Sequence, residues 1–487
     1  MNKAVRDLQP QDIWKNFADL NAVPRPSKKE EKVIKFMKEF GQRLGLETIE
    51  DEVGNVIIKK PATSGMEGRK TVVLQSHLDM VHQKNNDTIF DFDNQGIEMI
   101  VEGDWVKAKG TTLGADNGMG VAAIMAVLES TSLPHPAIEA LFTIDEETGM
   151  TGAKGLKGGL LKGQILLNLD TEEDDEIGVG CAGGIDITAT KNYLAETTPA
   201  RMVGYKIEIK GLQGGHSGMD IHKGLGNANK LMNRLLYNGY EKFGLRINEI
   251  NGGGLRNAIP RESSAVIAID ESSKQDFESH MNFIVNDIKS ELNTMEPDLQ
   301  IDYTTIDVPN LVMDLSVQED MIKSIYAAVN GVYRMSPDIP ELVETSNNIA
   351  KVIVKEGTVT ISCLTRSSVE SSKKDLAQSL EAAFKLMDCS VEFSGEYPGW
   401  TPNVNSEILK IMESLYKELN DNNAPHVAAC HAGLECGILG TNYPNLDMIS
   451  FGPNIRGAHS PDERVQISSV IKFWEFLKET LKRIPEA

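Results

Sequence analysis

Histidines that stand beside carboxylates are the residues best suited to chemistry in this chain. Among 487 residues there are nine histidines against 71 Asp and Glu, so a lone acid carries little information and a histidine next to one carries more. In VVLQSHLDM, His77 and Asp79 lie two apart, and on an extended chain they would point to the same side. Asp79 could then orient His77 while the second ring nitrogen binds a metal ion. For this motif alone, a buried histidine satisfied by its neighbour is an equally good explanation.

Two further motifs place acids at turns. In TTLGADNGMG, Asp116 lies in a glycine-rich turn just before a predicted helix. The glycines allow close approach, and Asp116 could either bridge two cations or simply cap the helix. In LFTIDEETGM, the acids Asp145, Glu146 and Glu147 follow an apolar strand. Adjacent anions repel unless they are solvated or neutralised, so this segment is either an exposed loop or a cation site in which a ligand and a base are neighbours.

Two more motifs complete a pattern at the ends of strands. Asp170 closes the apolar run ILLNLD, and His459 follows a predicted strand in SFGPNIRGAHSPDERV. Ligands of open α/β sheets bind beyond the carboxyl ends of the strands, so we expect these groups to converge. Two histidines with several carboxylates suit zinc or a pair of divalent cations. The sequence therefore predicts a metal centre.

The elements that must position these residues show two kinds of hydrophobic pattern along the sequence. The first 60 or so residues are predicted to be helical, with a capping box from Ser27 to Glu30. Uninterrupted apolar runs, typical of strands buried on both faces, then occur at residues 72–74, 140–144, 165–169 and 447–451. Beyond Gly183, alternating runs typical of antiparallel strands occur at residues 205–209, 265–269, 349–354 and 358–362.

These two hydrophobic patterns predict the fold class and the domain organisation. We expect an α/β catalytic domain formed by residues 1–184 and 398–487, with a mixed, largely parallel sheet and helices on both faces. Residues 185–397 would form an α+β lid domain, large enough to hold two similar α+β units. The chain is thus predicted to build one domain from both of its ends and to interrupt it with an insert.

The composition excludes several classes of partner. The formal net charge is −22, and such a surface repels nucleic acid and anionic membranes. The longest nearly uninterrupted apolar stretch, Val121 to Leu128, is far shorter than the roughly 20 residues of a membrane span. The N-terminal residues lack the apolar stretch of a secretory signal, and five cysteines are too few for a disulfide framework. We therefore expect a cytoplasmic protein with reduced thiols.

The motifs occur in an order that resembles a known family. The series H-x-D, G-A-D-N-G, D-E-E-T-G, N-L-D and G-A-H-S-P, interrupted by an α+β insert, resembles the di-zinc aminoacylase and carnosinase-type metallopeptidases. Within that family, TTLGADNGMG, GLQGGHSGMDIHKG and GPNIRGAHSPDERV are most similar to the bacterial Xaa-His dipeptidases. The likeness extends over nearly the whole chain. Asn117 follows Asp116 where many relatives have a second aspartate, which leaves the ligand itself unchanged.

The resemblance implies a set of metal ligands. It predicts two Zn²⁺ ions per chain, which Co²⁺ or Mn²⁺ could replace, and Asp116 would bridge them. His77 and Asp170 would complete one site. Glu147 and His459 would complete the other.

The resemblance also implies the catalytic roles. Glu146 would be the general base that takes a proton from water between the metals, and the resulting zinc-bridging hydroxide would attack the peptide carbonyl. Asp79 would orient His77. The expected substrate is a small dipeptide with a free amino terminus, with Xaa-His dipeptides of the carnosine type favoured.

Residues for substrate binding are predicted in and near the insert. In relatives, the histidine equivalent to His216 in GGHSG stabilises the tetrahedral oxyanion, although by its sequence alone it would be a loop histidine packing on its own domain. Asn257 and Arg366 are candidates for the oxyanion and the substrate carboxylate, since a guanidinium can grip a carboxylate with two hydrogen bonds. An arginine at a strand end is more often a solvated surface group. Arg456 and Gly433, beside the other motifs, are weaker candidates.

Two alternatives to this function remain at the level of sequence. Another amide hydrolase of the same architecture, such as an N-acyl amino-acid deacylase or a tripeptidase, would use the same metal chemistry. A binding protein without catalysis is disfavoured, because all five ligands, Asp79 and Glu146 are present. Relatives with a short insert dimerise through it, whereas this insert is long enough to replace such a partner internally. A homodimer is nevertheless the expected assembly.

Overall fold

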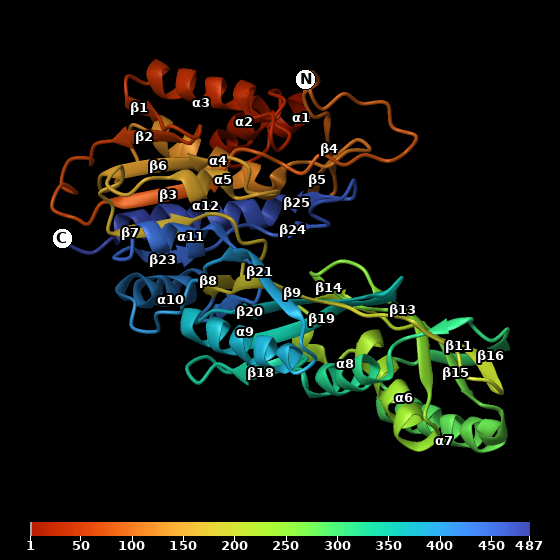
Figure 1. Ribbon diagram of the computed structural model, residues 1–487. Coiled ribbons are helices and arrows are strands. Elements are labelled where there is room, and N and C mark those ends of the chain that lie inside the picture. The colour runs from red at the N-terminus through yellow and green to blue at the C-terminus, as the bar shows by residue number, and fades with distance from the viewer. Residues whose placement is uncertain (1) are drawn as a thin grey trace. The chain divides into compact units, whose positions relative to one another are not determined.

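The fold is described from a computed structural model, in which residues 2–487 are placed. Two compact units divide the chain (Figure 1). The first consists of Met1–Gly180, Trp400–Ala429 and Leu434–Ala487. The second consists of Cys181–Gly399 and Cys430–Gly433, and it contains the predicted lid, residues 185–397.

An eight-stranded sheet forms the centre of the first unit. Its order is β1-β2-β6-β3-β7-β23-β8-β22. The strands are β1 (Glu47–Glu50), β2 (Val56–Lys60), β6 (Ile138–Thr143), β3 (Val72–His77), β7 (Ile165–Asn168), β23 (Asp447–Ser450), β8 (Glu176–Cys181) and β22 (His426–Cys430). The central strands β6, β3, β7 and β23 pair in parallel, whereas β1, β2 and β8 join antiparallel.

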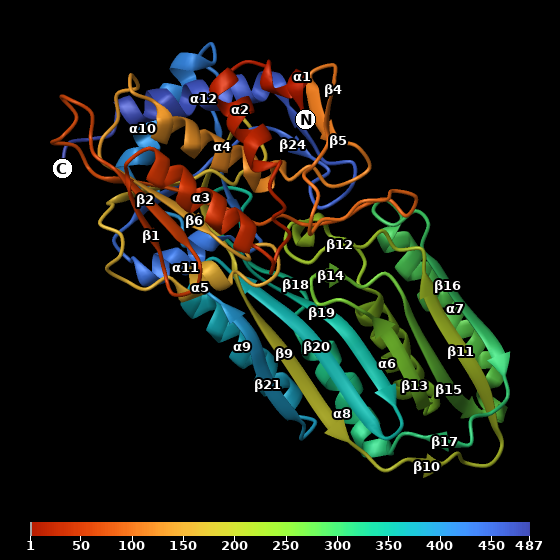
Figure 2. The same ribbon diagram turned by 90° about the horizontal axis from the view of Figure 1, so that it is seen from above.

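The parallel centre is explained by the apolar runs of the sequence. Every residue of β3, β6 and β7 is buried, as expected for strands covered on both faces. Figure 2 shows α4 (Ala115–Glu129) on one side of this sheet and α5 (Thr151–Gly155) and α11 (Glu435–Asn442) on the other. The mixed α/β prediction is confirmed, with the parallel pairing confined to the four central strands.

The remaining elements of this unit surround that sheet. A second sheet of four strands has the order β24-β25-β5-β4. Its strands are β24 (Ile455–Arg456), β25 (Arg464–Gln466), β5 (Trp105–Ala108) and β4 (Met99–Glu102). The other helices are α1 (Lys3–Arg6), α2 (Gln11–Leu20), α3 (Glu31–Arg43), α10 (Glu407–Leu419) and α12 (Ile467–Lys482). Within residues 2–487, none of the helices is long and apolar enough to cross a membrane.

The N-terminal region corrects two predictions. Residues 47–60 are not helical but form β1 and β2, because they pair with each other and with the buried strand β6. The predicted capping box is also wrong. Ser27 does not cap α3; its hydroxyl donates to the buried Asp79 carboxylate over 2.8 Å, and Glu30 accepts from the Lys28 amide instead.

The second unit is built on one antiparallel sheet of nine strands, covered by helices. The order is β16-β11-β15-β13-β19-β20-β9-β21, with β18 also paired to β19. The strands are β16 (Gln300–Ile306), β11 (Met202–Lys210), β15 (Ser263–Asp270), β13 (Arg246–Gly253), β19 (Val343–Lys355), β20 (Thr358–Ser367), β9 (Gly183–Asn192), β21 (Ser390–Tyr397) and β18 (Gly331–Met335). The helices are α6 (Ala228–Phe243), α7 (Lys274–Leu292), α8 (Leu315–Ala327) and α9 (Glu370–Lys385).

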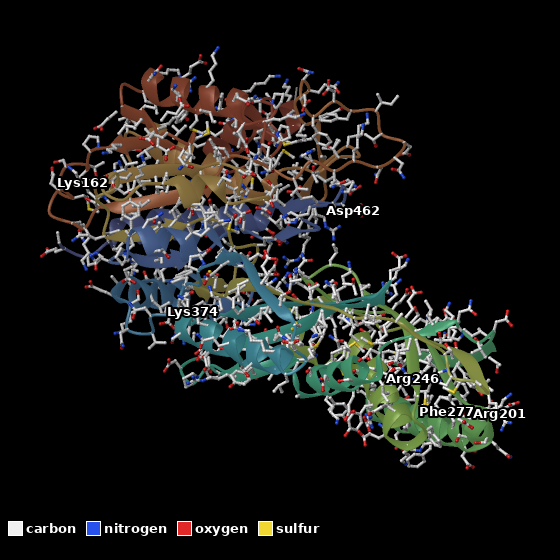
Figure 3. The ribbon with its side chains drawn as sticks, in the orientation of Figure 1. Lys162, Arg201, Arg246, Phe277, Lys374 and Asp462 are labelled. Carbon is white, nitrogen blue, oxygen red and sulfur yellow. The ribbon has the colours of Figure 1, made fainter. Side chains whose placement is uncertain are left out.

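Apolar side chains from the sheet and the helices form the core of the second unit. Phe277 of α7, labelled in Figure 3, is fully buried there. Its ring lies 5.3 Å from that of Tyr205 on β11. Asn227 caps the N-terminus of α6, because its side chain accepts hydrogen bonds from the backbone amides of Asn229 and Lys230. This unit therefore has a hydrophobic core of its own.

Candidate metal centre

The five predicted ligands meet at one edge of the first unit's sheet. His77 is the last residue of β3, and Asp170 follows β7 by two residues. Glu147 lies in the turn after β6, Asp116 is the second residue of α4, and His459 follows β24. The carboxyl ends of parallel strands lie at the same edge of a sheet, which is why segments distant in sequence converge here.

The carboxylate of Asp116 lies between two imidazoles. The Nε2 atom of His77 is 3.2 Å from Asp116 Oδ1 and 3.5 Å from Asp170 Oδ1. The Nε2 atom of His459 is 3.1 Å from Asp116 Oδ2 and 3.0 Å from Glu147 Oε2. Asp116 therefore turns one oxygen toward each of two donor groups, and each group contains one imidazole and one further carboxylate.

The donor atoms fit divalent cations. The Nδ1 atom of His77 lies 3.1 Å from the main-chain oxygen of Asp79 and 3.4 Å from Oδ1 of the same residue. Both are acceptors, so Nδ1 carries a proton, and Nε2 is the ring nitrogen that faces the carboxylates of Asp116 and Asp170. In addition, Glu147 Oε1 and Asp170 Oδ1 are buried without a hydrogen-bond donor. Such atoms require a proton or a cation, and this mixture of nitrogen and oxygen donors suits zinc.

The electric field at this edge also favours positive charge. Hydrogen bonds with Asp116 and Glu147 raise the pKa of His459 to about 11. Burial acts to lower the pKa of His77, but the charge of Asp170 and hydrogen bonds with acids outweigh it and raise that pKa well above its usual value. For Asp116, burial is outweighed by hydrogen bonds from both imidazoles, which lower its pKa. Divalent cations would be stabilised by the same field.

Asp79 organises more of the centre than the sequence predicted. Its fully buried carboxylate accepts the amide of Glu146 over 3.0 Å and that of Glu147 over 3.3 Å, in addition to its approach to His77. The hydroxyl of Ser27 supplies a further hydrogen bond. One carboxylate thus connects the end of β3 to the turn after β6, and so fixes His77 relative to both glutamates.

Glu146 has the environment of a strong base. One of its oxygens lies within 4.8 Å of donor atoms of His77 and Glu147. Burial raises the pKa of Glu146 well above its usual value, and the charges of Asp170 and Glu435 add to this while His77 opposes it. A carboxylate of raised pKa can take a proton and return it near neutral pH.

Several buried polar residues at this edge were missed by sequence reasoning. Glu435, at the start of α11, accepts hydrogen bonds from Gln75 over 2.7 Å and from Thr143 over 2.6 Å. Arg25 and Glu463 are likewise buried beside the ligand-bearing turns. A buried charge leaves no periodic pattern in a sequence, although Glu463 lies within the same motif as His459.

Most of the predicted substrate-binding residues belong to the second unit. His216 and Asn257 are neighbours there, because β12 (Gly215–His216) pairs with β14 (Ala258–Ile259) and the Ser217 amide donates to the Asn257 carbonyl. The Nδ1 atom of His216 accepts the amides of Gly218 and Met219 over 3.2 and 3.0 Å. The proton of a neutral His216 is therefore on Nε2, which is available as a donor.

The other candidates differ in their surroundings. Arg366 is buried in the second unit, donates to the Tyr397 hydroxyl over 2.7 Å and has an Nε atom without a partner. Gly433 ends the short segment Cys430–Gly433 of the same unit. Arg456 belongs to the first unit, where it pairs with Glu173 over 2.7 Å. The structure therefore groups Arg366 and Gly433, but not Arg456, with His216 in one unit.

His431, which sequence reasoning left unassigned, is expected to make the stability of the second unit depend on pH. It is buried, its Nε2 lies 2.8 Å from the Ser346 hydroxyl, and burial, reinforced by the charge of Arg366, lowers its pKa from 6.5 to about 3. Between these values the unfolded chain binds a proton that the folded chain does not, so stability falls as pH falls through this range. We expect this to cost about 2 kcal/mol between pH 7 and pH 5.

Urea unfolding at pH 7 and pH 5 measures this effect. The variant His431→Gln cannot titrate, so its unfolding midpoint should change less between the two pH values than that of the wild type. Comparing the two proteins cancels the contribution of every other titrating group. Equal changes in both proteins would contradict the assignment.

Comparisons with known proteins identify the family of this chain. The chain belongs to Peptidase family M20/M25/M40, whose profile matches residues 73–483. It is 44% identical over 478 residues to the cytosol non-specific dipeptidase of Escherichia coli (strain K12), covering 98% of each chain. The crystal structure of aminoacylhistidine dipeptidase from Vibrio alginolyticus has a TM-score of 0.95 and 43% identity, covering 99% of this chain and 98% of that chain. These findings confirm the family resemblance and the expectation that the chain is an enzyme.

A more distant structure shares the fold. A tripeptidase from Staphylococcus aureus has a TM-score of 0.56 and 17% identity, covering 98% of this chain and 99% of that chain. At this level of identity the likeness concerns the architecture alone.

Proposed function

We propose that this protein is a metal-dependent dipeptidase that hydrolyses small dipeptides with a free amino terminus, Xaa-His dipeptides among them. The observation that carries the proposal is the position of Asp116, whose two oxygens face two separate groups of imidazole and carboxylate donors. Two relatives that match nearly the whole chain, one named a non-specific dipeptidase and the other an aminoacylhistidine dipeptidase, support the substrate class.

The metal centre would hold two divalent cations, for which Zn²⁺ is the first candidate. Five residues would be the ligands: His77, Asp116, Glu147, Asp170 and His459. When bound, such cations polarise the scissile carbonyl and lower the pKa of water. Asp79 would fix the positions of His77, Glu146 and Glu147 relative to one another, because its carboxylate contacts all three.

Glu146 would move the proton of the reaction. Its carboxylate takes a proton from the attacking water, which forms the new bond to the carbonyl carbon. The same carboxyl then gives that proton to the leaving amine as the peptide bond breaks. Glu146 is thereby returned to its starting state.

The second unit would act as the lid and supply the contacts to substrate. We assign to the Nε2 proton of His216 a hydrogen bond to the developing oxyanion. Arg366 would grip the substrate carboxylate. Asn257, Gly433 and Arg456 are proposed to contact substrate as well, in supporting roles.

Replacing His216 with alanine tests the oxyanion role. We expect kcat to fall by about 10²–10³-fold, with a much smaller change in KM, because the contact forms mainly in the transition state. The matched control is His222→Ala, which removes a nearby exposed histidine and should leave kcat unchanged. Steady-state kinetics with equal zinc content in all three proteins make the comparison. A fall in kcat shared by both variants would contradict the assignment.

A panel of substrates tests the proposed function itself. Hydrolysis of β-Ala-His, a second dipeptide, an N-acetylated amino acid and a tripeptide would be measured with and without a chelator. We expect both dipeptides to be cleaved, the other two to be poor substrates, and the chelator to abolish activity until Zn²⁺ is restored. Preferential cleavage of the acetylated amino acid or the tripeptide would favour another amide hydrolase. Absence of all hydrolysis by zinc-loaded protein would favour a binding protein.

The proposal also covers the cellular compartment and the oligomeric state of the protein. The name of the Escherichia coli relative places that protein in the cytosol, and we propose the same compartment here. We also propose a homodimer, which sedimentation equilibrium of the purified protein would test.

A further inference from the structure

The turn that carries Asp116 binds a carboxylate from the far end of the chain. Four consecutive amides, those of Leu113, Gly114, Ala115 and Asp116, donate to Glu463 over 2.7, 2.9, 2.7 and 3.3 Å. The first two reach Oε2 and the last two reach Oε1. Glu463 is only 2% exposed. A concave row of backbone amides is an anion site, and here the anion is supplied by the chain itself.

A buried arginine holds the other side of the same turn. Arg25 is 1% exposed. Its Nη2 donates to the Gly114 carbonyl over 2.5 Å, and its Nη1 donates to the carbonyls of Leu78 and Asp79, each over 3.1 Å. The guanidinium therefore connects the segment directly after His77 to the turn before Asp116.

The glycines of this turn are explained by the arginine. A Cβ atom at Gly114 would lie 2.5 Å from Arg25 Nη2, and one at Gly118 would lie 2.6 Å from the same atom. Gly114 also has a φ of 70°, which favours glycine. The glycine-rich motif thus makes room for a guanidinium and gives the turn the shape that presents its amides to Glu463.

We propose that Arg25 and Glu463 are positioning residues, which set the distances of Asp116 from His77 and His459 before any cation binds. Glu463 lies in the loop that carries His459 and is bound to the turn that carries Asp116; Asp462, labelled in Figure 3, marks this loop. Arg25 binds that turn to the end of β3. Together they join three ligand-bearing segments that are remote in sequence. This inference rests on the proposed metal centre.

Zinc affinity of the metal-free protein tests the inference. In Glu463→Gln an amide NH₂ replaces one acceptor oxygen, so two of the four backbone amides lose their partner. Arg25→Lys cannot reach all three carbonyls at once. Loss of residues that orient ligands typically lowers metal affinity by about 10–100-fold, and we expect a rise in the Kd for Zn²⁺ of this size in both variants. With saturating Zn²⁺, kcat should return to within about 10-fold of the wild type, because neither residue contacts the substrate.

A buried carboxylate elsewhere in the same unit provides the matched control. Glu139 is 4% exposed and accepts the amides of Lys162 and Gly163 over 2.7 and 2.9 Å. Lys162 and Asp462 lie on opposite sides of the unit in Figure 3. Glu139→Gln likewise replaces a buried carboxylate that binds backbone amides with an uncharged side chain of the same size, and it should keep the wild-type Kd for Zn²⁺.

The outcomes separate this inference from the proposed function. Circular dichroism first confirms that each variant is folded, and Arg25→Lys carries the test if Glu463→Gln is not. Wild-type affinity for Zn²⁺ in the folded variants would overturn the inference while leaving the proposed function intact. An equal loss of affinity in Glu139→Gln would also overturn it. If the wild-type protein itself bound no Zn²⁺, the proposed function would fail and the inference with it.

Discussion

The variant Glu146→Ala is expected to lose about 10²–10⁴-fold in kcat while still binding its full complement of Zn²⁺. Glu146 is partly buried, one of its oxygens lies within 4.8 Å of donor atoms of His77 and Glu147, and it is not among the five proposed ligands. Its amide, rather than its carboxylate, makes the hydrogen bond to Asp79. Removing the side chain therefore takes away the base and leaves the backbone contacts of the turn in place.

Glu146→Gln separates loss of the base from loss of packing. Glutamine keeps the size of the side chain but cannot take a proton, so its kcat should be as low as that of the alanine variant. Dipeptide hydrolysis under saturating conditions and zinc content by atomic absorption are the measurements. Near-normal turnover in either variant would refute the role of Glu146. Loss of zinc together with activity would instead make Glu146 a ligand.

The strand ends were predictable from the sequence because the relevant physics is local. An apolar run such as residues 165–169 can be buried on both faces, and Asp170 then lies at its carboxyl end. The scarcity of histidine made His77 and His459 stand out. The resemblance to a family added the roles of these residues. Convergence at one edge then followed from parallel pairing.

Residues that act through tertiary contacts could not be predicted in this way. Ser27 matched a helix cap by its spacing, but in the fold the buried Asp79 carboxylate takes its hydrogen bond. The short strand β1 has only four residues and depends on β2 for its pairing. Arg25 and Glu463 are charges buried by partners about 90 and 350 residues away, and nothing in their own sequence segments indicates burial.

The substitution with the largest expected effect on metal content is Asp116→Asn. The two carboxylate oxygens face His77 and His459 at 3.2 and 3.1 Å. Asparagine keeps one oxygen, but its NH₂ group has no lone pair to offer and donates hydrogen bonds instead. The variant should therefore retain only one of two cations. We expect kcat/KM to fall by more than about 10³-fold, because several kcal/mol of transition-state stabilisation by the second cation would be lost.

The position of Asp116 between two imidazoles is what makes this result informative. The matched control, Asp462→Asn, removes an exposed carboxylate from the loop that carries His459 and should keep both metal content and activity. Zinc per chain after equilibration with excess Zn²⁺ is the decisive measurement, since a merely weakened site would refill and a site without its ligand would not. Two zinc ions in the Asp116→Asn protein would show that this carboxylate does not bridge. A fall from two to one, with activity lost, would be the result expected when one side chain serves both sites.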